Sequence, residues 1–117
     1  MVMEIGIDIE KNERFKDLAQ NVLERTFTKN ELEFAYRYKN FYEQLCAMWC
    51  VKEATVKAFS NLKIPFLEIE LVHAPSGKPE IVKNNTIKAE LEKLGLTEIK
   101  VSLSHSKDYA TAVVLIY

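Results

Sequence analysis

The first residues of the chain alternate between apolar side chains and polar or small ones. Isoleucine occupies positions 5, 7 and 9, and Gly6 and Asp8 lie between them. This period of two predicts a β-strand that is covered on one face, and it places Asp8 on the face opposite the isoleucines. Gly6 lies on the same face as Asp8, where its missing side chain leaves room for a close approach to the backbone.

Helical patterns follow this first strand. Residues 11–24 predict a helix, and residues 28–31 have the Thr-x-x-Glu form of a capping box, which predicts the start of a second short helix. Residues 41–59 contain no Gly or Pro and predict a long third helix. Apolar residues surround most of its axis, so we expect this helix to be largely buried.

The second half of the chain favours strands. Residues 66–74 and 80–83 flank a turn at 75–79 and predict a hairpin. A short helix is expected at 86–94, before Gly95.

Two further strands are expected near the C-terminus. Residues 99–103 alternate between apolar and polar side chains, and residues 109–117 are almost wholly apolar. With helices early and hairpin-linked strands late, the pattern predicts an α+β fold whose early helices pack on an antiparallel sheet. Because the last strand is apolar on both faces, we expect a second copy of the chain to cover one of them, which predicts a homo-oligomer.

Composition narrows the class of protein. The chain has 117 residues, of which 48% are apolar, with only 3 Gly and 3 Pro, and this predicts a single domain over residues 1–117. A formal net charge of -1 gives no broad basic field for nucleic-acid binding. No apolar stretch approaches the roughly 20 residues that cross a bilayer, and no secretion signal opens the chain. We therefore expect a cytoplasmic protein, with Cys46 and Cys50 as reduced thiols.

Charged residues on the long helix are the first candidates for chemistry. Glu53 and Lys57 fall on one stripe of an otherwise apolar helix, where a charge is costly unless it is paired or liganded. One interpretation is an ordinary ion pair between Glu53 and Lys57. The other is that Asp8 and Glu53 hold a hard cation such as Mg²⁺, with Lys57 beside the phosphates of a substrate.

Two turns carry weaker signals. His105 lies between the last two predicted strands and is either a turn residue or a ligand contact. Ser104 is not flanked by the glycines of a nucleophile elbow, so no hydrolase triad is predicted there. The segment Ser76–Pro79 is explained as a hairpin connection.

Taken in order, five motifs resemble those of the bacterial holo-acyl-carrier-protein synthases, the small 4'-phosphopantetheinyl transferases. The resemblance covers nearly the whole chain. The motifs are Gly6–Ile9 followed by Arg14 and Phe15, then Arg25–Glu31, Lys52–Ala58, Gly77–Pro79, and Ser102–His105 followed by Tyr109 and Ala110.

This resemblance implies a fold, an assembly and a reaction. It implies an α+β chain that forms a homotrimer, with active sites between neighbouring subunits. Coenzyme A would donate its 4'-phosphopantetheine arm to a serine of apo acyl carrier protein, and adenosine 3',5'-bisphosphate would be released.

The resemblance also implies roles for single residues. Asp8 and Glu53 would bind Mg²⁺ together with the pyrophosphate of coenzyme A, and Lys57 would contact the phosphates. Arg14 and Arg25 would meet the acidic carrier protein. The other residues implied to contact coenzyme A are Gly77, Lys78, Pro79, Ser104 and His105.

The chain departs from the family pattern at two positions. Met48 stands where the family usually has an arginine that assists with phosphate, and Lys52 is a candidate to replace that arginine. Ser60 stands where a glycine commonly follows the diagnostic helix motif.

Two other functions fit parts of the pattern. The first is a non-enzymatic oligomeric adaptor domain, in which Glu53 pairs with Lys57 and the surface with Arg14 and Arg25 binds an acidic protein. The second is a metal-dependent phosphodiester hydrolase, for which the sequence lacks the additional acidic or histidine ligands of a two-metal site.

Overall fold

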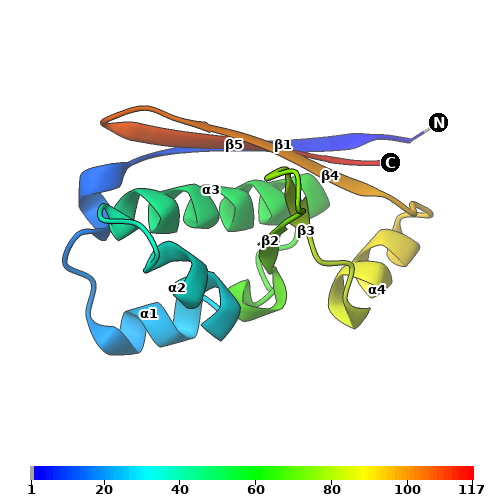
Figure 1. Ribbon diagram of the computed structural model, residues 1–117. Helices are drawn as coiled ribbons and strands as arrows, with labels where there is room; N and C mark the ends of the chain where they lie inside the picture. Colours follow the sequence, from blue (N-terminus) through cyan, green and yellow to red (C-terminus); the bar gives the residue numbers. More distant parts are fainter. Residues whose placement is uncertain (1) are drawn as a thin grey trace.

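An antiparallel sheet lies along one side of the long helix α3 in the computed structural model, which describes residues 2–117 (Figure 1). The sheet consists of β1 (Glu4–Lys11), β4 (Ile99–His105) and β5 (Tyr109–Ile116), in the order β1-β5-β4. Helix α3 spans Phe41–Phe59, as predicted, and it is buried over most of its length. The predicted α+β fold is therefore confirmed.

Gly6 sets how closely β1 packs on α3. A Cβ atom at this position would lie 1.9 Å from the carbonyl oxygen of Ala54 and 2.7 Å from the amide nitrogen of Ala58. Only glycine permits this contact, because any side chain would push the strand away from the helix. The close approach that the sequence suggested at Gly6 is thus made by α3.

The remaining helices form a layer on the other side of α3. In Figure 1, α1 (Gln20–Thr26) and α2 (Lys29–Ala35) lie on the side of α3 away from the sheet. Helix α2 begins with the predicted capping box, in which the Oγ1 atom of Thr28 accepts a hydrogen bond from the amide of Glu31 at 3.2 Å. In return, Glu31 Oε1 accepts from the amide of Thr28 at 2.9 Å.

The predicted hairpin and the helix that follows it are present. Strands β2 (Leu71–His73) and β3 (Pro79–Ile81) pair antiparallel, and α4 (Asn85–Lys93) follows them. The predicted first strand of this hairpin is too long, because residues 66–68 form a short 3₁₀ helix, η2 (Phe66–Glu68). The ammonium group of Lys52 accounts for this change, since it draws the carbonyl groups of Phe66 and Ile69 inward by hydrogen bonds.

The predicted helix over residues 11–24 is wrong. Strand β1 continues to Lys11, a 3₁₀ helix η1 (Asn12–Phe15) follows, and α1 begins only at Gln20. Contacts with distant residues decide the conformation at this corner. The amide of Asn12 donates to the carbonyl oxygen of Asp108 at 2.8 Å, which ties the end of β1 to the turn before β5.

The isoleucines of β1 lie on the outer face of the sheet. Ile5, Ile7 and Ile9 are 65%, 62% and 61% exposed, whereas Gly6 on the opposite face is buried under α3. Val113 and Leu115 of β5 lie in register beside these isoleucines. In a single chain, one face of the sheet is therefore covered by α3 and the other is an open apolar surface.

Two smaller features bear on the expectations from the sequence. Cys46 and Cys50 are buried free thiols on the face of α3 that meets the sheet, as predicted. Within residues 2–117, no helix combines the length and the apolar character needed to cross a membrane.

Candidate active site

Strand β1 and helix α3 bring Asp8 and Lys57 together. The Nζ atom of Lys57 lies 3.1 Å from Asp8 Oδ1 and donates a second hydrogen bond to the carbonyl oxygen of Ile7 at 2.9 Å. The expected ion pair between Glu53 and Lys57 is not among the ion pairs of residues 2–117. Lys57 instead contacts two residues of β1, Ile7 and Asp8, which are 50 and 49 positions away in the sequence.

One oxygen atom of Asp8 has no partner. Asp8 Oδ2 is buried and accepts no hydrogen bond from any of the described residues 2–117. An unpaired carboxylate oxygen that is removed from water is costly, and the usual compensation is a hydrogen-bond donor or a metal ion. This oxygen marks the place where a cation fits the structure.

Glu53 completes the acidic part of this site. Burial raises the pKa of Glu53 above its ordinary value, and the negative charge of Asp8 raises it further, whereas Lys57 and Arg14 oppose the shift. The two carboxylates are thus close enough to repel each other. A divalent cation between them would remove this repulsion and supply a partner for the unpaired Asp8 oxygen.

The protein supplies few ligands for such a cation. Within residues 2–117, no cluster of three or more His, Cys, Asp or Glu side chains is arranged to hold a metal ion. An ion held by Asp8 and Glu53 would therefore take its other ligands from substrate and water, which is the usual arrangement for Mg²⁺.

Part of the predicted nucleotide contact set lies in a cleft of about 400 Å³ at the β4 edge of the sheet. Gly77, Pro79 and His105 all line this cleft. Its other lining residues are Phe34, Tyr38, Gln44, Ala47, Met48, Leu71, His73 and Leu103.

Ser104 and Lys78 lie outside this cleft. Ser104 is exposed, and because side chains alternate along β4 it points to the opposite face of the sheet from His105. Lys78 is exposed in the β2–β3 turn and borders a separate hollow that also contains Lys83 and Lys100. The structure therefore does not place all six predicted coenzyme A contacts, Lys57 included, in one pocket.

The two groups of candidate residues lie at opposite edges of the sheet. Asp8 is on β1 and His105 on β4, with β5 between them. On α3, Met48 lines the cleft whereas Glu53 faces the β1 edge, and five residues correspond to a rotation of about 140° around a helix axis. A single chain thus presents the acidic cluster, which consists of Asp8 and Glu53, and the cleft in different directions.

The two arginines are both accessible. The Nη1 atom of Arg14, in η1, lies 2.5 Å from Glu10 Oε2, and its guanidinium group lies 4.8 Å from the ring centroid of Trp49. The effect of Arg14 on the pKa of Glu53 places it close to the acidic cluster. Arg25 is exposed in the last turn of α1.

Lys52 is not a phosphate ligand, contrary to the suggestion drawn from the sequence. Its side chain is buried, and Nζ lies 2.8 Å from Glu31 Oε1. The same ammonium group donates to the carbonyl oxygens of Phe66 at 2.8 Å and Ile69 at 2.5 Å. Burial lowers the pKa of Lys52 and Glu31 opposes this shift, so the residue belongs to an internal ion pair and cannot reach a ligand at Met48.

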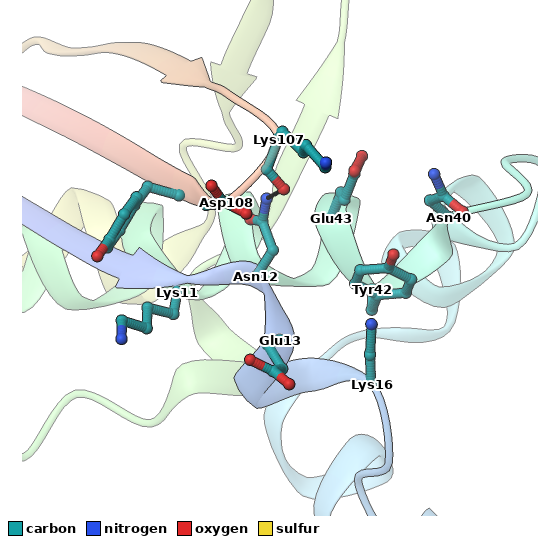
Figure 2. Close-up of a pocket in the computed structure, with 10 residues that line it drawn as sticks. Lys11, Asn12, Glu13, Lys16, Asn40, Tyr42, Glu43, Lys107 and Asp108 are labelled. Atoms are coloured by element: carbon teal, nitrogen blue, oxygen red, sulfur yellow. Dashed lines mark hydrogen bonds between the residues drawn. The ribbon is translucent and has the colours of Figure 1, made fainter.

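A second hollow, of about 480 Å³, lies at the corner between β1 and η1 (Figure 2). Asn12 is at its centre, and the Asn12 side-chain amide donates to the carbonyl oxygens of Ser106 and Lys107 at 3.0 Å each. This contact fixes the turn that follows His105. None of the residues predicted to bind ligand lines this hollow, and its size alone does not make it the reaction site.

Several residues of the cleft were not singled out from the sequence. Phe34 and His73 form a parallel ring stack, with centroids 4.1 Å apart and an interplanar angle of 6°. They come from α2 and β2, which pack together only in the folded chain. No local sequence signal could have paired them.

Known proteins are similar to this chain in sequence and in fold. A model of the 4'-phosphopantetheinyl transferase superfamily matches residues 4–114. The holo-[acyl-carrier-protein] synthase of Aquifex aeolicus (strain VF5) is 42% identical over 119 residues, which cover 96% of this chain and 96% of that protein.

Solved structures agree with the sequence comparison. The holo-[acyl-carrier-protein] synthase from Neisseria meningitidis superposes with a TM-score of 0.87 at 26% identity, over 97% of both chains. A holo-(acyl-carrier-protein) synthase from Bacillus anthracis, in complex with coenzyme A (3',5'-ADP), gives a TM-score of 0.80 at 29% identity, over 98% of this chain and 97% of that one. These matches confirm the family resemblance that the motifs indicated, and the chain belongs to the 4'-phosphopantetheinyl transferase superfamily.

Proposed function

We propose that this protein is a holo-[acyl-carrier-protein] synthase. It transfers the 4'-phosphopantetheine group of coenzyme A to a serine of apo acyl carrier protein and releases adenosine 3',5'-bisphosphate. The observation that carries this proposal is the cluster of Asp8, Glu53 and Lys57, which joins β1 to α3 at the positions of the family's two most diagnostic motifs.

Asp8 and Glu53 would hold Mg²⁺. The unpaired Asp8 oxygen and the mutual repulsion of the two carboxylates both support this assignment. When bound, Mg²⁺ would neutralise the charge that develops on the diphosphate during transfer. Asp8 and Glu53 would also orient the diphosphate toward the incoming serine, because substrate phosphates complete the coordination of such an ion.

Lys57 would stabilise the leaving group. Its ammonium group now neutralises Asp8, but half of its side chain is exposed, so it can turn toward a phosphate oxygen. As the serine hydroxyl releases its proton to solvent and its oxygen bonds to the phosphorus that carries pantetheine, the bond from this phosphorus to the bridging oxygen breaks and adenosine 3',5'-bisphosphate leaves with that oxygen. An ammonium group beside the departing oxygen stabilises the transition state more than the ground state.

We propose that the protein acts as a homotrimer with sites between subunits. In one chain the acidic cluster and the cleft lie at opposite edges of the sheet, so one ligand could meet both only across two copies. The open isoleucine face of β1 offers an apolar surface for that contact. Free thiols at Cys46 and Cys50 support a location in the cytoplasm.

Introduction of a charge on the outer face of the sheet tests the assembly. Light scattering of the wild-type protein should give about three times the mass of one chain, 13.5 kDa. Ile7→Lys places a charge in the apolar contact and should yield monomers with greatly reduced transfer activity. Leu62→Lys is the matched control, because Leu62 is 89% exposed outside the sheet and should tolerate the charge. A wild-type monomer, or an active monomeric Ile7→Lys variant, would contradict the trimer.

Arg14 should steer the acidic carrier protein. Arg14→Glu reverses an exposed charge beside the acidic cluster, so the KM for the carrier should rise by about tenfold and its salt dependence should weaken. The KM for coenzyme A should change little. Lys88→Glu, on the exposed side of α4, carries the same change in net charge away from the site. Equal effects of the two variants would rule out local docking at Arg14.

The proposed reaction has a direct assay. The protein is mixed with coenzyme A, Mg²⁺ and an apo acyl carrier protein, and the carrier is examined by intact mass spectrometry. We expect a phosphopantetheine adduct on the carrier and an equal amount of adenosine 3',5'-bisphosphate in solution. Omission of Mg²⁺, or replacement of the acceptor serine by alanine, should abolish both products. No adduct from a folded protein would exclude the proposed function.

A further inference from the structure

We propose that the buried pair of Glu31 and Lys52 positions the β2–β3 hairpin and, through it, the part of the cleft wall that the hairpin forms. Both are positioning residues, because neither of them lines the cleft. The inference rests on the proposed function, which supplies the identity of the donor that the cleft would hold.

The pair binds the main chain at the base of the hairpin. The Nζ atom of Lys52, which lies 2.8 Å from Glu31 Oε1, donates to the carbonyl oxygens of Phe66 at 2.8 Å and Ile69 at 2.5 Å. Glu31 Oε2 accepts from the amide of Leu71, the first residue of β2, at 3.0 Å. Two charged side chains thus hold the segment from which the hairpin begins.

The start of α2 is tied to the same segment. The hydroxyl group of Thr28 donates to Glu70 Oε2 at 2.5 Å, and its oxygen accepts from the amide of Glu31 in the capping box. Glu70 directly precedes β2. The bonds of the ion pair and of the capping box therefore form one network that joins α2, α3 and the base of the hairpin.

The pair lies one step below three walls of the cleft. Met48, which lines the cleft, precedes Lys52 by four residues and lies on the same side of α3. Phe34, which also lines the cleft, follows Glu31 by three residues on α2. Leu71 contacts the pair through its amide and lines the cleft itself. Three elements that enclose the cleft thus meet at one ion pair.

The hairpin depends on its base for its position. Strands β2 and β3 have three residues each, and a two-stranded hairpin is at best marginally stable by itself. The cleft residues that it carries are Leu71, His73, Gly77 and Pro79. A shift at the base would move all of them together relative to α3 and β4.

The chemistry of the pair suits a role in positioning. Glu31 is 1% exposed and Lys52 is fully buried, so both charges carry a large desolvation cost, and apolar side chains of similar volume can stabilise an interior equally well. Apolar side chains cannot bind particular carbonyl and amide groups, however. What the ion pair adds is the selection of one position for the hairpin, and this separates its effect on the cleft from its effect on stability.

The double variant Glu31→Leu with Lys52→Met is the main test. It leaves no buried charge and keeps the interior filled, so it should fold, as judged by circular dichroism. We expect the KM for coenzyme A to rise by about tenfold, the change produced when the hairpin occupies its binding position a tenth of the time. The values of kcat and of the KM for the carrier should not change. Calorimetric binding of adenosine 3',5'-bisphosphate should weaken by the same factor.

Hydrogen exchange tests the position of the hairpin without any measurement of activity. The amides of Ala74 and Val82 donate to the carbonyl oxygens of Lys78 and Glu70 and have no bond to the ion pair. Both amides should exchange faster in the double variant. The amides of β5, which lies in the middle of the large sheet, should exchange as in the wild type.

Two further variants keep the test decisive. If the main variant does not fold, Glu31→Gln with Lys52→Met retains an acceptor for the capping box and should give a smaller rise of the KM for coenzyme A. Leu91→Ala is the control for a general loss of stability, because Leu91 is buried in α4 and does not line the cleft. It should leave the KM for coenzyme A unchanged.

The outcomes distinguish this inference from the proposed function. An unchanged KM for coenzyme A or unchanged exchange of the hairpin in a folded double variant would overturn the inference, and so would an equal rise of the KM in Leu91→Ala. If the wild type transfers no phosphopantetheine, the proposed function fails. Faster exchange of the hairpin and weaker binding of adenosine 3',5'-bisphosphate in the double variant would still support the positioning role.

Discussion

Asp8→Asn is expected to lower kcat by a factor of about 1000 or more, because several kcal/mol of transition-state stabilisation by a metal ion would be lost. The substitution keeps the side-chain volume but removes the negative charge that now faces Lys57 at 3.1 Å. Glu53→Gln should have an effect of the same order, since it removes the second proposed ligand. The measurement is the initial rate of carrier modification over a range of Mg²⁺ concentrations.

A matched control separates a local effect from a general effect of charge. Glu13→Gln removes one acidic charge from the exposed part of η1, outside the acidic cluster, and should leave the rate within about twofold of the wild type. If Asp8→Asn or Glu53→Gln retains substantial Mg²⁺-dependent activity, the two acids are not the metal ligands.

The stability of the Glu53→Gln variant, compared with that of the wild type, shows whether the substitution affects the fold. The pKa of Glu53 is raised in the folded chain by burial and by Asp8, so the folded state binds this proton more readily than the unfolded state. The contribution of Glu53 to stability therefore falls as pH rises through the ordinary glutamate pKa and the raised pKa. Without metal at neutral pH, Glu53→Gln should be at least as stable as the wild type. Lower stability in thermal unfolding would show that the carboxylate has a structural role.

Lys52→Met should cause the largest loss of stability. It leaves Glu31, which is 1% exposed, as a buried carboxylate without its cation, and it removes the ammonium donor from the carbonyl oxygens of Phe66 and Ile69. Loss of one partner of a buried ion pair costs about 3–5 kcal/mol. Urea unfolding followed by circular dichroism measures this loss as a shift of the midpoint at unchanged slope.

The exposed ion pair between Lys83 and Glu98 provides the comparison. Both side chains are 43% exposed, so Lys83→Met should cost no more than about 1 kcal/mol. Combining Lys52→Met with Glu31→Gln should recover part of the loss, because the neutral amide needs no cation and its one oxygen can still accept from the amide of Thr28 or that of Leu71. If Lys52→Met lowers the free energy of unfolding no more than Lys83→Met does, the buried pair of Lys52 and Glu31 contributes little to stability.

The elements predicted well from the sequence are those fixed by local pattern. The stretch of α3 without Gly or Pro and the capping box at Thr28 predict helices that the structure contains. Alternation in β1 places Asp8 on the face that meets α3. That Asp8 and Glu53 share one edge of the sheet followed only from the family resemblance, because local pattern carries no information on which strand pairs with which helix.

The errors lie where distant residues decide the local conformation. Asn12 interrupts the predicted helix because its backbone and side chain bond the turn at residues 106–108, near the far end of the chain. Residues 66–68 are not a strand because Lys52, on α3, holds their carbonyl groups. The sequence suggests Lys52 as a replacement for the family arginine, and only the packing of α2 against α3 reveals its pairing with Glu31.

Ser104 and His105 illustrate a smaller discrepancy. The alternating pattern predicts a strand that ends at residue 103 and a turn that contains both residues, and the family resemblance implies that both contact coenzyme A. The structure continues β4 to His105, and the alternation of a strand then directs the two side chains to opposite faces. Only His105 lines the cleft within one chain.

The most direct measurement of the central claim is a crystal structure with Mn²⁺, as a substitute for Mg²⁺, and coenzyme A. Anomalous scattering should locate one Mn²⁺ ion with oxygen ligands from Asp8, Glu53 and the diphosphate, and the Nζ atom of Lys57 should have moved from Asp8 to a phosphate oxygen. Coenzyme A bound with Mn²⁺ elsewhere, and with the pair between Asp8 and Lys57 still intact, would contradict the account.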